Sequence, residues 1–483
     1  MLKRGVKGSI TIFCLLLAMS VIVLITSLFD ILRLYYAVST FSGYSAEAIS
    51  AVMNSPKDDY RKIIGFSFIG DSEQEIGNRL KNNFERLHAG EEILGVSLSV
   101  EPVVQGVFLT DSPETAYLAV QDFTAFNLSK ADYNRCEESI YEFCIKAREI
   151  NKEISLLESI NHAAYDISEP GMEDGFLGYW YQEIPNRATV AEGKYTRRFS
   201  RKMMRWCGDS RMTEDRFLTN KGTISLLDSA EAAVYYGTEV LAGYPVFQWY
   251  NCNAYAAYSE WFQRIINLMV YSDVFLTDAS NGRAGKSGLT GEYEYLLYGD
   301  SSDRWNIAKV CEQIMYLRYA FNLYTIATDE DLLEMLDTDE SSRNKQMVAW
   351  AIRESIYDVK TLLAGYRVPT IKTGNQFATM FDTDVFKISS GTGTDGRSYR
   401  EYLWELSLYS VSSRQIVCSE TMYARWIDWI LYVTGIDAET TPLMATCYLQ
   451  LEIGYEPISI AGAMIDLEDI GCLDFVLKTG DQP

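Results

Sequence analysis

Histidine is scarce in this chain, which limits the kinds of site that it can build. Among 483 residues there are two histidines, His88 and His162, and no C-x-x-C pattern. Zinc sites rely on histidines and closely spaced cysteines, so we expect no metal site. A Ser–His–Asp triad would need one of the two histidines, and neither has a G-x-S-x-G elbow nearby. The sequence therefore predicts neither a catalytic centre nor a bound cofactor.

Basic residues are also few. The chain has 43 Lys and Arg against 66 Asp and Glu, a formal net charge of −23. Such a surface repels phosphate backbones, which argues against nucleic-acid binding, and it favours solubility. One dense basic cluster stands out in an aromatic segment: Arg197, Arg198, Arg201, Lys202 and Arg205. The cluster is either a surface for an acidic partner or anionic glycan, or a patch that pairs with the protein's own acids.

The nine cysteines form no recognisable framework. Cys14 lies in an apolar run, and eight cysteines lie beyond it, an even number that allows up to four disulfides. Cys136 and Cys144 are eight residues apart on one predicted helix, roughly 12 Å, which is too far for a disulfide within that helix. We therefore favour buried small side chains over disulfides.

An uncharged stretch of about 20 residues, from Ile10 to Phe29, follows Lys3, Arg4 and Lys7. This length crosses the hydrocarbon core of a bilayer as a helix, and the basic flank favours a cytoplasmic N-terminus. The stretch exceeds a signal-peptide core, and no small-x-small site follows it. We expect a single-pass anchor in the cell membrane, with the rest of the chain outside. The expected span is marked by Ile10, Leu17, Leu24 and Phe29.

Helical spacing of apolar residues continues past the expected span. Ile31, Leu34, Val38, Phe41 and Ile49 are close to helical spacing, so one helix is predicted to reach about Met53. An apolar N-terminal helix followed by an extracytoplasmic globular region is the architecture of a pilin-like subunit. It is also the build of any single-pass anchored protein.

We expect an α+β fold in which a transmembrane helix extends into a long pilin-like helix. A mostly helical extracytoplasmic region with small β-sheet elements follows. The predicted segments are the anchor (1–53), an α+β region with the aromatic and basic segment (54–250), and a mostly helical region with terminal strands (251–483). Strands are predicted over Val96–Leu109, Leu443–Gly454 and Ile458–Leu467. Helices are predicted over Lys130–Asp166, Glu260–Phe275, Asp303–Thr328, Arg343–Leu363, Ser398–Ser412 and Glu420–Val433.

Three motifs suggest chemistry but lack the context that it needs. Residues Gly391 to Gly396 fit G-x-G-x-x-G, yet too little chain follows for a large parallel sheet. Residues 280–287 resemble a P-loop, with Ser280 in place of the first glycine. Glu292 and Glu294 would share a face if GEYEYLLYG were a strand, and an acid pair of this kind could serve glycoside hydrolysis. For each motif we favour a structural role.

Two stretches carry a resemblance to known proteins. Residues Gly8 to Met53, with Asp30 and Arg33 after the apolar run, resemble the start of TadE/TadG-like proteins of the Tad (Flp) pilus machinery. The blocks GEYEYLLYG, KVCEQIMYLRYAFNLYTIATD, VKTLLAGYRVPTIKT and YREYLWELSL resemble, in this order, a bacterial family of single-pass membrane proteins. That family shares the TadE/TadG-like start and is taken to be pilus- or secretion-associated, without known catalytic residues.

The resemblance implies a structural component of a Tad-type pilus or related secretion apparatus, either a minor pilin-like protein or an accessory protein. Its partners would be the bilayer and other pilus or pseudopilin-like membrane proteins. Cleavage after Gly8 would place Phe13 where major pilins keep a glutamate, so a role outside the filament shaft is favoured. The alternative is a surface protein that binds glycan or cell wall through the Gly175–Trp206 region, or, less favoured, a carbohydrate-active enzyme.

Overall fold

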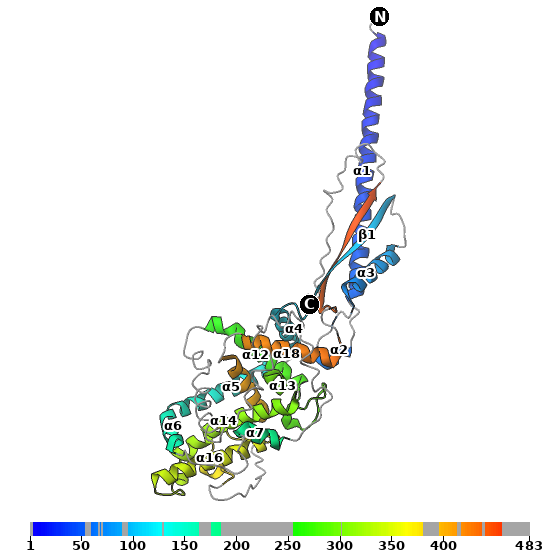
Figure 1. Ribbon diagram of the computed structural model, residues 1–483. Helices are drawn as coiled ribbons and strands as arrows, with labels where there is room; N and C mark the ends of the chain where they lie inside the picture. Colours follow the sequence, from blue (N-terminus) through cyan, green and yellow to red (C-terminus); the bar gives the residue numbers. More distant parts are fainter. Residues whose placement is uncertain are drawn as a thin grey trace. The chain divides into compact units, whose positions relative to one another are not determined.

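The computed structural model describes residues 3–53, 59–65, 68, 71–88, 95–127, 130–163, 175–184, 255–300, 302–379, 396–412, 417–436 and 440–455. These residues confirm the α+β class, because helices dominate and one small sheet is present (Figure 1). The chain divides into two compact units. Unit 1 comprises Met1–Lys62, Ser67–Leu109 and Asp437–Pro483, and unit 2 comprises Ile63–Phe66 and Thr110–Ile436. This division differs from the three predicted segments because a late strand returns to pair with an early one.

Unit 1 is built on the long helix α1 (Lys3–Met53). Helix α3 (Glu73–His88) and the antiparallel strands β1 (Val96–Val107) and β2 (Met444–Tyr455) complete it. The strands pair from Val96 opposite Tyr455 to Val107 opposite Met444. A capping box starts α3, since Ser72 and Glu75 exchange side-chain to backbone hydrogen bonds. The division of the chain falls within the short helix α2 (Asp59–Ile64), because unit 1 includes its residues up to Lys62 and unit 2 begins at Ile63.

The core of unit 1 lies between α1, α3 and the strand pair. Helix α1 contributes residues that recur every three or four positions, and β2 contributes alternate residues, as each type of element requires for one buried face. The main members are Leu34, Ala37, Phe41, Ala48, Ile49, Val52, Ile76, Leu80, Phe84, Val96, Ala445, Cys447 and Leu449. The C-terminal part of α1 is therefore a core element of a folded unit.

Unit 2 is helical in its described residues. Its helices are α4 (Pro113–Asn127), α5 (Lys130–Asn151), α6 (Ile154–Ala163), α7 (Gly175–Glu183), α12 (Tyr255–Phe275), α13 (Glu292–Tyr298), α14 (Asp303–Thr328), α15 (Glu330–Leu333), α16 (Glu340–Leu363), α17 (Tyr399–Ser412) and α18 (Val417–Thr434). Two short 3-10 helices, η2 (Ala279–Asn281) and η3 (Gly374–Gln376), lie between them. The large fully buried side chains include Tyr271, Tyr319, Trp350, Trp426 and Trp429.

Most predicted elements are present, with one correction. The predicted helix over Lys130–Asp166 is two helices, α5 and α6, because the chain turns at Lys152 and Glu153. The segment that begins at Glu292 forms the helix α13, so the condition under which Glu292 and Glu294 would share one face of a strand is not met. The strands predicted near β1 and β2 are confirmed, and the predicted strand Ile458–Leu467 lies outside the described residues.

Three of the cysteines beyond the apolar run are buried in the described part of the chain, as expected for small core side chains. Cys447 belongs to the core of unit 1. In unit 2, the Cys136 thiol donates to Met269 Sδ at 3.7 Å. Burial raises the pKa of the Cys311 thiol well above its ordinary value, which keeps this thiol protonated.

Candidate functional site

The first half of α1 exposes a continuous apolar surface. The predicted span residues Ile10, Leu17, Leu24 and Phe29 are 57%, 57%, 70% and 51% exposed. Helix α1 is long and apolar enough to cross a membrane. The hydroxyls of Ser20, Thr26 and Ser27 donate to carbonyls one turn earlier in the same helix, at 2.9, 3.0 and 2.6 Å. These hydroxyl groups are thus satisfied without water, as a lipid environment requires.

An ion pair begins directly after the last residue of the expected span, Phe29. The guanidinium of Arg33 is 3.2 Å from the carboxylate of Asp30, and the two side chains are 7% and 0% exposed. Gly95, at the start of β1, has φ +75°, and a Cβ there would lie 2.5 Å from Arg33 Nη2. The pair is therefore enclosed by unit 1 at the point where the body of the unit begins.

The basic cluster Arg197, Arg198, Arg201, Lys202 and Arg205 lies outside the described residues. The start of the aromatic region is described, because it forms α7. There Phe176 and Trp180 are buried, and Trp180 Nε1 donates to Met315 Sδ at 3.4 Å. These two aromatic side chains belong to the core of unit 2 and do not form a glycan-stacking surface.

Glu292 occupies the first turn of α13 and is fully buried. Its Oε2 accepts from Thr277 N and Oγ1 at 3.0 and 3.2 Å. Its Oε1 accepts from Ser287 N and Oγ at 2.8 and 2.6 Å, and from Trp429 Nε1 at 3.0 Å. A Cβ at Gly285 would lie 2.2 Å from this carboxyl group, so the loop approaches it closely. The Glu292 carboxyl group therefore organises the loop that precedes α13.

That loop contains the P-loop-like residues, and the structure gives them other partners. Ser287 is bound to Glu292, and Lys286 Nζ donates to the Ile63 carbonyl at 2.7 Å. The helix that follows, α13, has only seven residues. The hydroxyl and ammonium groups of the motif are thus engaged within the protein, which agrees with the structural role favoured from the sequence.

Glu294 is the second acid of α13 and differs from the first. Its Oε1 accepts from Ala279 N at 2.8 Å and from Tyr399 Oη at 2.9 Å. Burial and the nearby negative charge of Asp278 raise the pKa of Glu294 to about 8. A carboxyl group with this pKa holds its proton at neutral pH. Both acids are fully buried and bound to neighbouring groups of the protein, so neither carboxyl group lies open to a sugar substrate.

Replacing Glu294 by glutamine should change how stability depends on pH. The folded pKa of about 8 lies above the ordinary 4.5, so the wild type loses stability as pH rises between these values. The loss is at most about 1.4 kcal/mol per pH unit. Glu294→Gln lacks this titration, so its stability relative to wild type should rise across the window. Urea unfolding of both proteins in detergent, at several pH values in this range, measures the difference. A constant difference would contradict the shifted pKa.

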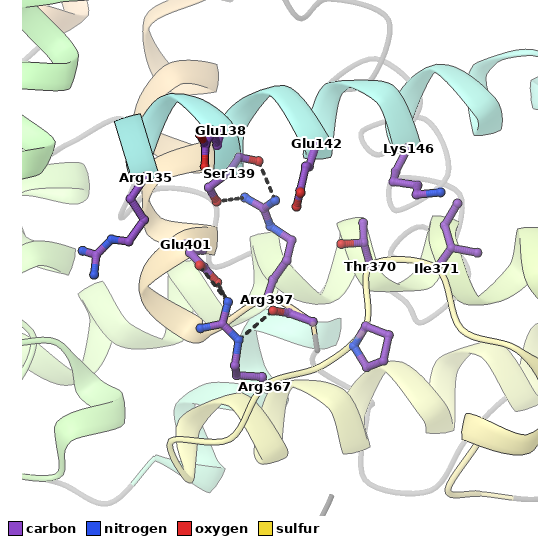
Figure 2. A pocket seen from close by; sticks show the side chains of 12 residues that line it. Arg135, Glu138, Ser139, Glu142, Lys146, Arg367, Thr370, Ile371, Arg397 and Glu401 are labelled. Carbon is purple, nitrogen blue, oxygen red and sulfur yellow. Dashed lines mark hydrogen bonds and ion pairs between the residues drawn. The ribbon is translucent and has the colours of Figure 1, made fainter. Parts of the chain in front are cut away.

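A cavity of about 330 Å³ lies on unit 2 between α5 and two loop segments (Figure 2). Helix α5 forms one wall, and the opposite wall contains Arg367, Thr370 and Ile371 (Figure 2). Arg397 donates to the Ser139 carbonyl and hydroxyl at 2.8 and 3.0 Å and pairs with Glu405. Gly396 ends the G-x-G-x-x-G motif with φ +114°, and a Cβ there would lie 2.5 Å from the Val368 backbone.

The arginines of this cavity are already neutralised. Arg367 donates to both oxygens of Glu401, at 2.8 and 2.7 Å, and to the Gly396 carbonyl at 2.7 Å (Figure 2). Arg135 is 2.8 Å from the Asp273 carboxylate. Each guanidinium forms an ion pair with a carboxylate of the protein itself, so the cavity does not concentrate positive charge for an anion.

A buried ionic network holds the loop that forms one wall of the cavity. Arg318, which is fully buried, donates through Nε to Asp358 at 2.8 Å and through Nη1 to the carbonyls of Pro369 and Thr370, both at 2.8 Å. Lys372 pairs with Asp358 at 2.5 Å and also with Glu354. Burial raises the pKa of Asp358, but the positive charges of Arg318 and Lys372 outweigh this effect and lower it overall. Two cations and two carboxylates thus balance within the core.

Sequence reasoning missed this network and the cavity, since their members lie far apart along the chain. It did single out Asp30, Arg33, Glu292 and Glu294. It did not predict the ion pair between Asp30 and Arg33, nor the contacts of Glu292 and Glu294 with neighbouring loops. The spacing of Asp30 and Arg33, three residues apart on a helix, was a usable signal.

The second half of the chain is similar to a known protein family. Residues 254–338 and 345–453 match the model of a family of unknown function (DUF5702). The matched residues extend from α12 into β2 and include the acids of α13 and the ionic network, but they make up less than half of the chain. No curated protein and no solved structure matches.

Proposed function

We propose that this protein is a membrane-anchored structural component, minor pilin-like or accessory, of a Tad-type pilus or related secretion apparatus. In this proposal the N-terminus is cytoplasmic, and the two units lie on the outer side of the membrane. The role is structural and involves no enzymatic reaction. Its partners are the bilayer and other pilus or pseudopilin-like membrane proteins, as the resemblance of residues 8–53 implies.

The observation that carries the proposal is the division of α1 into two parts. The first part exposes large apolar residues, whereas the second part, from Leu34 to Val52, packs into the core of unit 1 with α3 and the β1–β2 pair. Helix α1 runs between the two parts as one α-helix. A helix that is apolar and uncovered at one end and a core element at the other is the build of a pilin-like subunit. The engagement of Glu292 and Glu294 in loop structure supports a non-enzymatic role.

A charge in the apolar part should release the protein from membranes. Leu17→Arg places a cation near the centre of the expected span, at a cost of roughly 2.5–3.5 kcal/mol. We expect the variant to shift from the membrane to the soluble fraction after cell lysis and carbonate extraction, measured by immunoblot. The matched control is Glu47→Arg, an exposed position on the same helix beyond the apolar surface, which should stay membrane-bound. A Leu17→Arg variant that fractionates like wild type would argue against a spanning helix.

The pilus association needs a separate test. We expect the wild-type chain, purified from solubilised membranes, to bring pilus or secretion-apparatus subunits with it, and Glu47→Arg to do the same. Mass spectrometry identifies the recovered proteins.

Charge reversal at Arg197, Arg198 and Arg201 distinguishes the glycan-binding alternative from the pilus role. Loss of cell-wall binding with intact piliation would favour that alternative, and loss of the recovered subunits would favour the pilus role.

A further inference from the structure

The exposed apolar surface of α1 continues past the expected span on one side of the helix. Ile31, Leu32, Tyr35 and Tyr36 are 52%, 55%, 74% and 59% exposed. Among the residues of α1 whose exposure is described, Tyr36 is the last large exposed apolar one, and the exposed positions after it are Ser39, Gly43, Glu47, Ser50 and Ala51. The surface therefore changes from apolar to small and polar at one level, directly after two adjacent tyrosines.

The opposite side of the helix at this level is covered by the protein. Asp30 and Arg33 are buried as an ion pair, and Leu34 and Ala37 enter the core of unit 1. Gly95 packs its backbone against Arg33 at the start of β1. The body of unit 1 thus begins six residues before the apolar surface ends, and the two overlap along α1.

From these observations we infer that unit 1 is seated in the headgroup region of the bilayer, with Tyr35 and Tyr36 as interfacial anchors. The inference rests on the proposed membrane anchoring and adds the depth at which the body sits. The helix from Lys7, the last charged residue before the apolar run, to Tyr36 measures about 44 Å. A bilayer with its headgroup regions is about 40–45 Å thick, and tyrosine is enriched at that boundary.

Lipid fits this surface better than a second helix does. Helix–helix contacts in membranes favour small residues along a narrow seam. Here the exposed residues are large, and they cover nearly half of the helix circumference, since successive residues are about 100° apart. The neutral Asp30–Arg33 pair, enclosed by unit 1, lets charged residues follow the apolar run directly without meeting hydrocarbon.

Fluorine NMR in nanodiscs tests whether unit 1 lies in the headgroup region. Trifluoromethyl-phenylalanine replaces Leu17, Tyr36 or Glu47, one at a time, in the full chain. The nanodiscs contain phosphatidylethanolamine and phosphatidylglycerol with a nitroxide on either the headgroup or the acyl chain. We expect the headgroup nitroxide to broaden the signal at position 36 several-fold more than the signal at position 47. We expect the acyl-chain nitroxide to broaden the signal at position 17.

The three positions test two hypotheses separately: that unit 1 lies in the headgroup region, and that α1 spans the membrane. The headgroup nitroxide could broaden the signals at positions 36 and 47 equally and weakly, while the acyl-chain nitroxide still broadens the signal at position 17. This result would overturn the headgroup position of unit 1 but not the membrane anchoring by α1. A signal at position 36 that neither nitroxide broadens, with position 17 broadened, would mean that protein covers it and would also overturn the headgroup position of unit 1. A signal at position 17 that the acyl-chain probe does not reach would overturn both.

Discussion

Arg318→Leu should destabilise the protein by about 3–5 kcal/mol, because it breaks a buried ionic network. The substitution leaves the Asp358 oxygen that Arg318 contacts at 2.8 Å, and the carbonyls of Pro369 and Thr370, without their shared donor. Replacement by an apolar residue cannot restore these bonds, and Asp358 and Glu354 then share a single cation, Lys372. Urea unfolding in detergent, followed by tryptophan fluorescence, should show a clearly lower midpoint.

A surface ion pair provides the matched control for Arg318. Lys146 lies 3.6 Å from Glu149, and both side chains are nearly half exposed. Lys146→Ala should change the free energy of unfolding by no more than about 0.5 kcal/mol. Arg318→Lys keeps the charge but loses the planar fork, so its cost should be intermediate. If Arg318→Leu and Lys146→Ala unfolded at the same urea concentration, the network would not contribute as argued.

Glu292→Gln should cost about 3 kcal/mol or more, because all five of its hydrogen-bond partners are donors. These are the backbone N–H groups of Thr277 and Ser287, their two hydroxyls, and the indole of Trp429. A glutamine amide turns one acceptor oxygen into an NH₂ group that faces donors. Each buried group left without a partner costs about 1–3 kcal/mol. The free energy of unfolding, measured by urea denaturation in detergent, should fall accordingly.

Glu294→Gln is the matched control for this prediction. Both acids lie in the same helix and are fully buried, and the same atom replacement is made in each. Glu294 is protonated at neutral pH, so glutamine should preserve or raise stability there. Equal destabilisation by the two substitutions would show that helix α13 tolerates no amide at either position and would remove the distinction drawn between the acids.

Local signals predicted much of the secondary structure. The strand patterns that became β1 and β2 and the helix Asp303–Thr328 follow from period-two and helical spacing, and Ser302 caps that helix with its side chain. The break between α5 and α6 was missed because apolar spacing continues through it while the chain turns at Lys152 and Glu153. The segment at Glu292 was ambiguous because seven residues are too few to distinguish the two periods.

The sequence by itself determined the apolar helix, the acidic balance and the class of fold, because each depends on composition or on spacing within one segment. Tertiary structure alone decided that Asp30 and Arg33 are buried together as an ion pair. It also decided that Glu292 binds the loop before α13, whereas burial raises the pKa of Glu294. Finally, it placed Arg318 and Lys372 on the same carboxylate, that of Asp358. Burial and partners come from residues distant in the chain. The same carboxyl group is a solvated charge or a structural centre according to what surrounds it.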